Sequence, residues 1–209
     1  MDSARLAAVF KNTFDVIMVD APCSGEGMFR KEQAAIDEWS IENVNKCACR
    51  QAEILENAAK CLASGGYIIY ATCTFSLEEN EMTVDNFLKL HSEFEIIPVK
   101  SEVQKATADG IKFNGCACEN IHFARRFYPH KAKGEGQFMA VLHHKGDGDF
   151  IPNKAGAKPV KLDPAVIAFL DDTLENYNKD SIAFYGDNPV FYSGDIDIKK
   201  GTALCAVSQ

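Results

Sequence analysis

Two cysteines stand where two predicted β-strands end. One strand runs from Phe14 to Asp20 and leads to Cys23, and the other begins at Tyr67 and ends at Cys73. Short, apolar, β-branched runs of this kind favour a parallel sheet that is covered on both faces. Open α/β sheets carry their chemistry beyond the carboxyl ends of the strands. Because neighbouring strands lie about 4.8 Å apart, the two thiols could act together on one small planar substrate.

A carboxylate and a predicted helix end accompany the thiols. Asp20 precedes Cys23 in a turn where Gly25 and Gly27 permit close backbone approach. Cys73 stands just before a predicted helix N-terminus, which lowers a thiol pKa from its usual value of about 8.5. A single buried cysteine at a strand end is more often simple packing, so the chemical interpretation depends on the pair.

The elements around these residues form a predicted β-α-β unit. Ser40 is a plausible N-cap for a helix whose apolar stripe recurs at three- and four-residue spacing as far as Leu62. Gly65 and Gly66 are expected to stop this helix before the second strand. The connection between the two strands is expected to be right-handed.

The segments outside this unit carry weaker signals of secondary structure. Ser76 and Glu79 form a capping box that opens a helix through Leu88, and strands are predicted over 94–99 and 137–143. The segment 101–120 has no clear periodicity, which predicts an insertion or a mobile loop. Beyond residue 149 we expect a helix from Asp163 to about Tyr177 and two short aromatic strands around 186–189.

Composition limits the class of protein. The 209 residues are 46% hydrophobic and 25% charged, as in an ordinary globular protein, and contain neither a membrane-length apolar run nor a signal-peptide pattern. We therefore predict a cytoplasmic protein, in which eight cysteines argue against a disulfide framework. The net charge of −8 disfavours nonspecific binding of polyanions. The segment 120–133, however, has no acidic residue and interleaves basic with aromatic side chains, which suits either RNA or a solvated loop.

Three ordered motifs resemble those of one enzyme family. They are DAPCSGEGMFRK from Asp20, ATCTFSLEENE from Ala71, and RFYPH from Arg126 followed by GEGQF from Gly134. Together they resemble the Sun-type RNA cytosine-5 methyltransferases (RsmB/RsmF-like), and the continuation after Cys23 looks most like the RsmF-like branch, which modifies ribosomal RNA. The resemblance extends from about Arg5 to Leu142.

The resemblance implies a fold and a mechanism. The fold would be α/β, with residues 1–149 forming the C-terminal half of a Rossmann-like class I methyltransferase sheet and 150–209 beginning a small α+β module. Cys73 would be the nucleophile that adds to cytosine carbon 6, and Cys23 would assist release of the methylated base. Asp20 would lie beside both the base and the cofactor, S-adenosylmethionine. The candidate RNA contacts are basic and lie in two motifs: Arg30, Lys31, Arg126, His130 and Lys131.

The same resemblance predicts that the main cofactor-binding loop is missing from this chain. Family members bind the cofactor mainly through a Gly-rich loop after the first strand, and no glycine precedes Gly25 in this chain. We therefore expect an N-terminally truncated fragment that is inactive alone, in which the strand from Phe14 to Asp20 has one unpaired, apolar edge.

Three alternatives remain open from the sequence. The pairs Cys47/Cys49 and Cys116/Cys118 could be imagined as a zinc site, but one intervening residue is fewer than zinc sites use, so we predict no metal. A thiol redox protein is disfavoured because the strand-end cysteines do not form a Cys-x-x-Cys motif. The main rival is a non-catalytic RNA-binding or partner-dependent module whose cysteines are idle.

Overall fold

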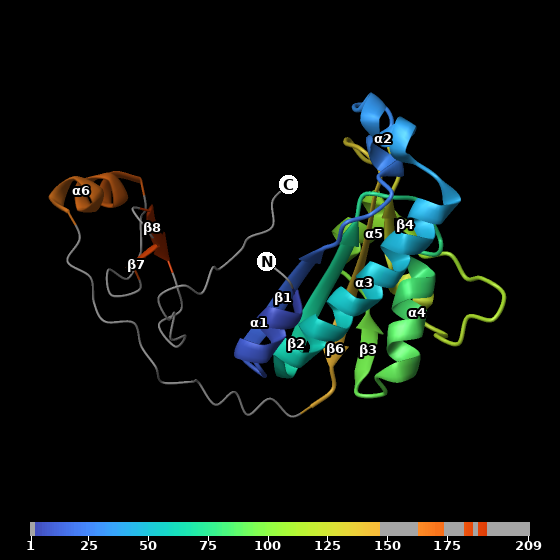
Figure 1. Ribbon diagram of the computed structural model, residues 1–209, viewed down its shortest axis with the longest axis horizontal. Helices are drawn as coiled ribbons and strands as arrows, with labels where there is room; N and C mark the ends of the chain where they lie inside the picture. Colours follow the sequence, from blue (N-terminus) through green and yellow to red (C-terminus); the bar gives the residue numbers. More distant parts are fainter. Residues whose placement is uncertain (1–2, 147–162, 174–181, 186–187, 192–209) are drawn as a thin grey trace. The chain divides into compact units, whose positions relative to one another are not determined.

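The structure is a computed structural model that describes residues 3–146, 163–173, 182–185 and 188–191 (Figure 1). The chain divides near residue 150 into two compact units, which are described separately.

The first unit is built on a mixed sheet. Its strand order is β1 (Phe14–Asp20), β2 (Leu62–Thr72), β6 (Gln137–His144), β5 (Arg125–Phe127) and β4 (Ala108–Asp109), and β3 (Phe94–Ile97) also pairs with β6. Strands β1 and β2 are parallel, whereas every pairing that involves β3 to β6 is antiparallel. The predicted α/β class is therefore confirmed, and β1 pairs only with β2 among the described strands.

Two long helices lie side by side on one face of this sheet (Figure 1). Helix α3 (Ile41–Cys61) begins where the sequence predicts, because the Ser40 hydroxyl accepts a hydrogen bond of 3.0 Å from the backbone N–H of Asn43. Helix α4 (Glu81–Leu90) lies next to it, and the short helix α1 (Ser3–Val9) packs on α3. Four shorter helical segments complete the unit: η1 (Glu26–Met28), α2 (Gln33–Glu38), α5 (Ser101–Ala106) and η2 (Ile121–Phe123).

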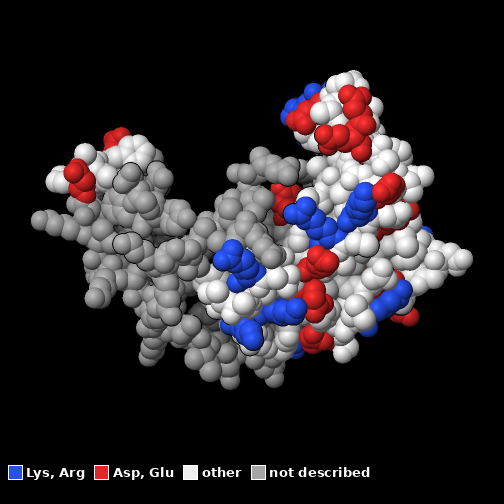
Figure 2. Space-filling view, viewed as in Figure 1, with Lys and Arg blue, Asp and Glu red and all other residues white. Residues whose placement is uncertain are grey.

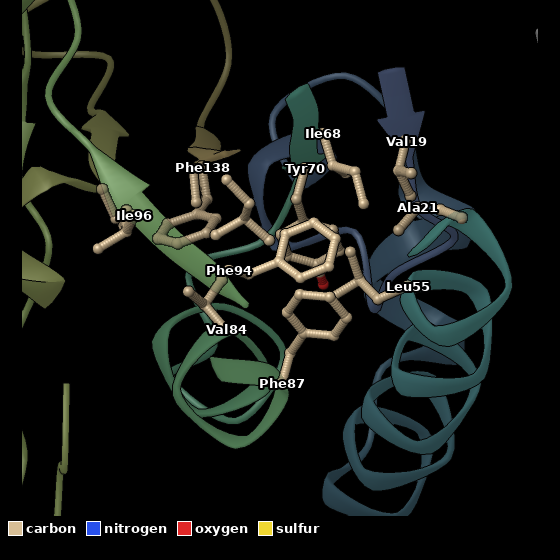
Figure 3. Close-up of a cluster of buried hydrophobic side chains, with 14 of the residues drawn as sticks. Val19, Ala21, Leu55, Ile68, Tyr70, Val84, Phe87, Phe94, Ile96 and Phe138 are labelled. Atoms are coloured by element: carbon tan, nitrogen blue, oxygen red, sulfur yellow. The ribbon is translucent and has the colours of Figure 1, made fainter. Parts of the chain in front are cut away.

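The hydrophobic core fills the space between α3, α4 and the sheet (Figure 3). Leu55, Tyr70 and Val84 are completely buried there, and burial of each such side chain stabilises the fold by about 1.5–3 kcal/mol. The Tyr70 hydroxyl donates a 2.7 Å hydrogen bond to the backbone oxygen of Glu79. The core is thereby joined to the loop that follows β2, where Cys73 lies.

The opposite face of the sheet differs from the prediction. Val16 and Met18 of β1 are 56% and 70% exposed, whereas Val19 on the same strand is 7% exposed. The expectation that both faces are covered is therefore wrong for the described residues. An uninterrupted apolar run does not distinguish a strand that is buried on both faces from one that is buried on a single face.

Element boundaries differ in two places. Helix α3 ends at Cys61 and β2 starts at Leu62, so Gly65 and Gly66 lie inside the strand instead of stopping the helix. A Cβ on Gly66 would lie 2.7 Å from the backbone oxygen of Asp15, and the pairing of β1 with β2 shifts register at this point. Segment 101–120, expected to be an insertion or a mobile loop, contains α5 and β4.

The second unit holds one helix and one hairpin. Helix α6 (Pro164–Thr173) begins after Asp163, whose carboxylate accepts a 2.8 Å hydrogen bond from the backbone N–H of Ala165. Strands β7 (Ile182–Tyr185) and β8 (Asn188–Phe191) pair antiparallel, in agreement with the predicted aromatic strands. The predicted continuation of the helix to Tyr177 lies outside the described residues. None of the described helices combines the length and apolar character that crossing a membrane requires.

Candidate active site

The carboxyl ends of β1 and β2 bring the two predicted cysteines together. Asp20 pairs with Ala71 in the parallel register, so both strands end at the same level. The sulfur atoms of Cys23 and Cys73 lie 3.0 Å apart, and the backbone N–H of Cys73 donates to the Cys23 sulfur at 3.3 Å. Both cysteines are free and partly buried. The sequence therefore predicted this juxtaposition correctly.

The two thiols differ in proton affinity. The pKa of Cys73 is lowered, chiefly because the Cys23 thiol hydrogen-bonds to its sulfur, whereas burial and the negative charges of Asp20 and Glu79 act in the opposite direction. The pKa of Cys23 is raised by the same hydrogen bond, by burial and by the charge of Cys73. The hydrogen bond between the two thiols therefore moves their pKa values apart, which favours the thiolate form at Cys73 and the protonated form at Cys23. A thiolate is the nucleophilic form of cysteine.

A buried carboxylate holds the loop that carries Cys23. Glu79 is fully buried, and its Oε2 accepts hydrogen bonds from the backbone N–H of Ser24 at 3.0 Å and from the Gln51 amide at 2.8 Å. The same Gln51 nitrogen donates to the backbone oxygen of Pro22 at 2.9 Å. The residues on both sides of Cys23 are thus tied to helix α3 and to the loop after Cys73. Burial raises the pKa of Glu79, and the hydrogen bonds from Ser24 and Gln51 oppose that rise.

Side chains beyond the thiols also join the two loops. The hydroxyl oxygens of Ser24 and Thr74 are 2.9 Å apart. The residue that follows Cys23 is thus hydrogen-bonded to the residue that follows Cys73. Glu26 accepts from the backbone N–H of Phe75 at 2.9 Å and from the Trp39 indole at 3.0 Å. These contacts fix the position of the loop after Cys73 relative to the turn after Cys23.

Gly27 is required where the two loops pass closest. Its backbone N–H donates to the Cys73 oxygen at 2.8 Å, and a Cβ added to it would lie 2.2 Å from the Gly136 oxygen. Any side chain at this position would therefore push apart the backbone segments that bear the two cysteines. This is the close approach that the sequence predicted for the glycines after Cys23.

Asp20 is an exposed carboxylate near the thiol pair. It is the last residue of β1, it is exposed, and its charge is close enough to raise the pKa of Cys73. No described residue donates a hydrogen bond to its carboxylate. An unpaired, exposed carboxylate beside a thiol of lowered pKa is suited to a polar or cationic ligand group.

One predicted RNA contact is buried instead. Arg126 is 2% exposed, and its guanidinium binds the buried Glu81 carboxylate through contacts of 2.7 and 2.5 Å. It also donates to the Phe75 oxygen at 3.0 Å. Arg126 is therefore a structural residue that supports the loop after Cys73, and the prediction that it contacts RNA is corrected. Its basic side chain is already neutralised by a partner that lies distant in sequence.

The other basic candidates are exposed. Arg30 donates to the backbone oxygen of Gly134 at 3.1 Å, and Lys31 forms a 3.2 Å ion pair with Glu135, which brings the turn after Cys23 to the loop before β6. His130 and Lys131 lie on that side of the molecule in an exposed turn. Their contact with RNA remains a prediction.

Charge on the visible face of the first unit is mixed. Figure 2 shows basic and acidic side chains interspersed, with acidic side chains gathered over α2, where Glu32, Asp37 and Glu38 stand. Attraction of an anionic polymer to the whole face is therefore not expected, and binding must rely on local groups.

The cysteines outside the pair do not form a metal site within the described residues. No group of three or more His, Cys, Asp or Glu side chains converges there. Cys116 and Cys118 instead border Asp85, whose Oδ1 accepts from the backbone N–H groups of Ala117 at 3.0 Å and Cys118 at 2.7 Å.

Sequence reasoning missed the supporting carboxylates. Glu26, Glu79 and Glu81 all stand inside the two cysteine motifs, yet each acts on a segment distant in sequence. The one available signal was the capping box. The Ser76 hydroxyl does accept from the Glu79 N–H at 3.3 Å, but the Glu79 side chain turns to Ser24 and not back to the cap.

Comparison with known proteins agrees with this geometry. Residues 1–143 match the family model described as 16S rRNA methyltransferase RsmB/F. Ribosomal RNA small subunit methyltransferase F from Aeromonas salmonicida is 35% identical over 163 residues, which covers 73% of this chain and 31% of that protein. The enzyme of the same name from Serratia proteamaculans is 33% identical over 150 residues, covering 68% of this chain and 29% of that protein. The chain thus spans less than a third of the length of these relatives.

Solved structures show the same fold. NSun6 from Pyrococcus horikoshii, determined with SFG, is 28% identical with a TM-score of 0.52 and covers 70% of this chain and 34% of its own. A methyltransferase homolog protein from the same organism is 26% identical with a TM-score of 0.53 and covers 68% of this chain and 43% of its own.

The fold and the matched structures define the class as an α/β methyltransferase with a Rossmann-like sheet. Within that class, the chain belongs to the 16S rRNA methyltransferase RsmB/F family, and its curated relatives place it with the RsmF-like members.

Proposed function

We propose that this chain forms the cysteine side of the active site of an RNA cytosine-5 methyltransferase that acts on ribosomal RNA. The observation that carries the proposal is the Cys23–Cys73 pair, with sulfur atoms 3.0 Å apart and pKa values shifted in opposite directions. A thiol of lowered pKa beside a thiol of raised pKa supplies a nucleophile and a hydrogen-bond donor at one place, and this chemistry needs both.

The first step uses the Cys73 thiolate. Carbon 5 of cytosine is a weak nucleophile until the ring loses its aromatic character. The Cys73 sulfur adds to carbon 6, a carbon–sulfur bond forms, and the electrons of the 5,6 double bond become available at carbon 5 to take up a methyl group. The addition leaves a negative charge on the ring, and a proton taken up from solvent at nitrogen 3 neutralises it. Asp20, exposed beside Cys73, would accept a hydrogen bond from the polar edge of the base.

The second step reverses the addition. After carbon 5 is methylated, a water molecule takes up the carbon-5 proton and the carbon–sulfur bond breaks, which restores the double bond and frees Cys73 as the thiolate. A sulfur leaves more readily when a hydrogen bond stabilises it as the thiolate. The Cys23 thiol, 3.0 Å from the Cys73 sulfur and with a raised pKa, is placed to supply that hydrogen bond. We therefore assign release of the product to Cys23.

The methyl donor that we propose is S-adenosylmethionine, which supplies an electrophilic methyl group on sulfur. Asp20 is the residue of this chain that we assign to it, because its carboxylate is exposed, unpaired among the described residues and at the carboxyl end of a sheet strand. The expected cytoplasmic location stays a prediction.

The addition step can be tested on this chain without the methyl donor, because it needs only the thiol and the base. A ribosomal RNA fragment that contains 5-azacytidine, whose carbon 6 is more electrophilic, would be incubated with the chain and resolved on a denaturing gel. We expect a covalent RNA–protein band with the wild type and with Cys23→Ala, and none with Cys73→Ala. Cys49→Ala, an exposed cysteine on α3, is the matched control and should keep the band.

Two outcomes would overturn the assignment. A band that survives Cys73→Ala would show that another residue is the nucleophile. Absence of a band with the wild type and with Cys23→Ala, on an RNA that the chain binds, would favour a non-catalytic RNA-binding module with idle cysteines.

A further inference from the structure

Three aromatic rings form a continuous stack that starts beside Cys73 and ends in solvent. Phe75 and Tyr128 have ring centroids 5.7 Å apart at an interplanar angle of 25°, and Tyr128 and His130 lie 5.4 Å apart at 17°. These distances and angles are those of offset-stacked aromatic pairs. Phe75 and Tyr128 are partly buried, whereas His130 is exposed. The stack therefore ends on a ring that is open to solvent.

The inner end of the stack is held rigidly. The Phe75 N–H donates to Glu26 at 2.9 Å, and the Phe75 oxygen accepts from Arg126 at 3.0 Å. Its ring fills the space beside Gly136, where an added Cβ would lie 1.8 Å from the Phe75 ring. A stack with a fixed base keeps the outer ring in place before any ligand arrives, which reduces the entropic cost of binding.

Unpaired positive charge surrounds the outer end. Lys131 and Lys133 are exposed and form no ion pair with a described carboxylate, and Arg30 donates a hydrogen bond to the backbone oxygen of Gly134. The acidic residue nearest in sequence, Glu135, is already paired with Lys31. The exposed ring is therefore bordered by groups that attract phosphate, whereas the protein as a whole carries a net charge of −8.

We propose that His130 is a stacking platform for an unpaired base of single-stranded RNA, with Lys131 and Lys133 contacting the adjacent phosphates. Aromatic rings beside basic side chains are how proteins bind single strands without reading sequence, because every base has a π face. Two ring-to-ring steps of 5.7 and 5.4 Å separate His130 from Phe75, so the base on His130 is a different nucleotide from the target cytosine. The ligand class, RNA, rests on the proposed function, but the platform itself does not depend on the chemistry of the cysteines.

Equilibrium binding of an unmodified RNA tests the platform. Fluorescein-labelled decauridylate would be titrated with the full chain and followed by fluorescence anisotropy at fixed salt. His130→Ala should weaken binding by about fivefold to a hundredfold, because base stacking on a ring contributes that much. His130→Phe should stay within about twofold of the wild type. His122→Ala, which removes another exposed histidine of the same segment, is the matched control and should also change little.

The outcomes separate this inference from the proposed function. Wild-type affinity for His130→Ala, equal losses for His130→Ala and His130→Phe, or no saturable binding by the wild type would each refute the platform. If the wild type forms no covalent adduct with 5-azacytidine RNA but His130→Ala binds decauridylate more weakly, the platform is supported and the catalytic assignment is refuted. If the wild type forms the adduct and His130→Ala keeps wild-type affinity for decauridylate, the catalytic assignment is supported and the platform is refuted.

Discussion

Removal of one partner from the buried ion pair between Arg126 and Glu81 should be among the most destabilising single substitutions in the first unit. Their side chains are 2% and 0% exposed, two nitrogen–oxygen contacts join them, and Arg126 also donates to the Phe75 oxygen. Arg126→Met removes all of these hydrogen bonds. The Glu81 carboxylate then keeps one described donor, the Ile111 N–H at 2.8 Å.

An uncompensated buried charge costs about 3–5 kcal/mol. For a urea dependence of about 2 kcal/mol per molar, Arg126→Met should lower the unfolding midpoint by about 1.5–2.5 M. Glu81→Gln should cost a similar amount because it leaves the guanidinium without its counter-charge. The double variant should cost clearly less than the sum of the two single variants, since neither charge then remains unpaired.

Urea titration followed by circular dichroism measures these differences. Lys46→Met is the matched control, because Lys46 pairs with Glu42 on the surface of α3 at 70% and 77% exposure, and loss of such a pair costs under about 1 kcal/mol. If Arg126→Met costs no more than this control, Glu81 is not left as an uncompensated buried charge, which would refute the prediction. Additive losses in the double variant would show that the two side chains do not act as a pair.

Three further predictions concern the loops that bear the thiols. Cys23→Ala should raise the pKa of Cys73, because it removes the hydrogen bond that lowers it, whereas Cys23→Ser should largely retain that bond; the pH profile of Cys73 alkylation, followed by mass spectrometry, should move to higher pH only for the alanine variant. Glu79→Gln should shift the same profile to lower pH, since the Glu79 charge raises the pKa of Cys73, and an unchanged or opposite shift would contradict this placement of the carboxylate. Gly27→Ala should lower the free energy of unfolding by about 1–3 kcal/mol through backbone overlap and should slow adduct formation at Cys73. A thermal melt measures the first effect and the gel assay the second. Unchanged stability and adduct formation would contradict the claim that a glycine is required at this position.

The sequence predicted the thiol pair because its signal is local. Each cysteine follows a strand within three residues, and the carboxyl ends of neighbouring parallel strands lie at the same edge of the sheet. The structure places the sulfur atoms of Cys23 and Cys73 3.0 Å apart, as this reasoning requires. The start of α3 after Ser40 was predicted for the same reason, because an N-cap acts within its own turn.

What sequence reasoning missed depends on contacts between distant segments. Arg126 is interpreted as an exposed RNA contact because its neighbours are basic and aromatic, but its partner Glu81 lies 45 residues away in sequence. The role of Glu79 is hidden in the same way, because its side chain bonds to Ser24, 55 residues away. Exposure of Val16 and Met18 on one face of β1 depends on what covers the sheet, which strand composition does not encode.

The most direct test of the account is to locate the carbon–sulfur bond. The chain would be trapped on RNA that contains 5-azacytidine, digested with protease and nuclease, and sequenced by tandem mass spectrometry to identify the residue that carries the nucleotide. We predict the nucleotide on Cys73 alone, in the wild type and in Cys23→Ala. Attachment to Cys23, or to any residue other than Cys73, would contradict the assignment of nucleophile and releasing thiol on which the proposed mechanism rests.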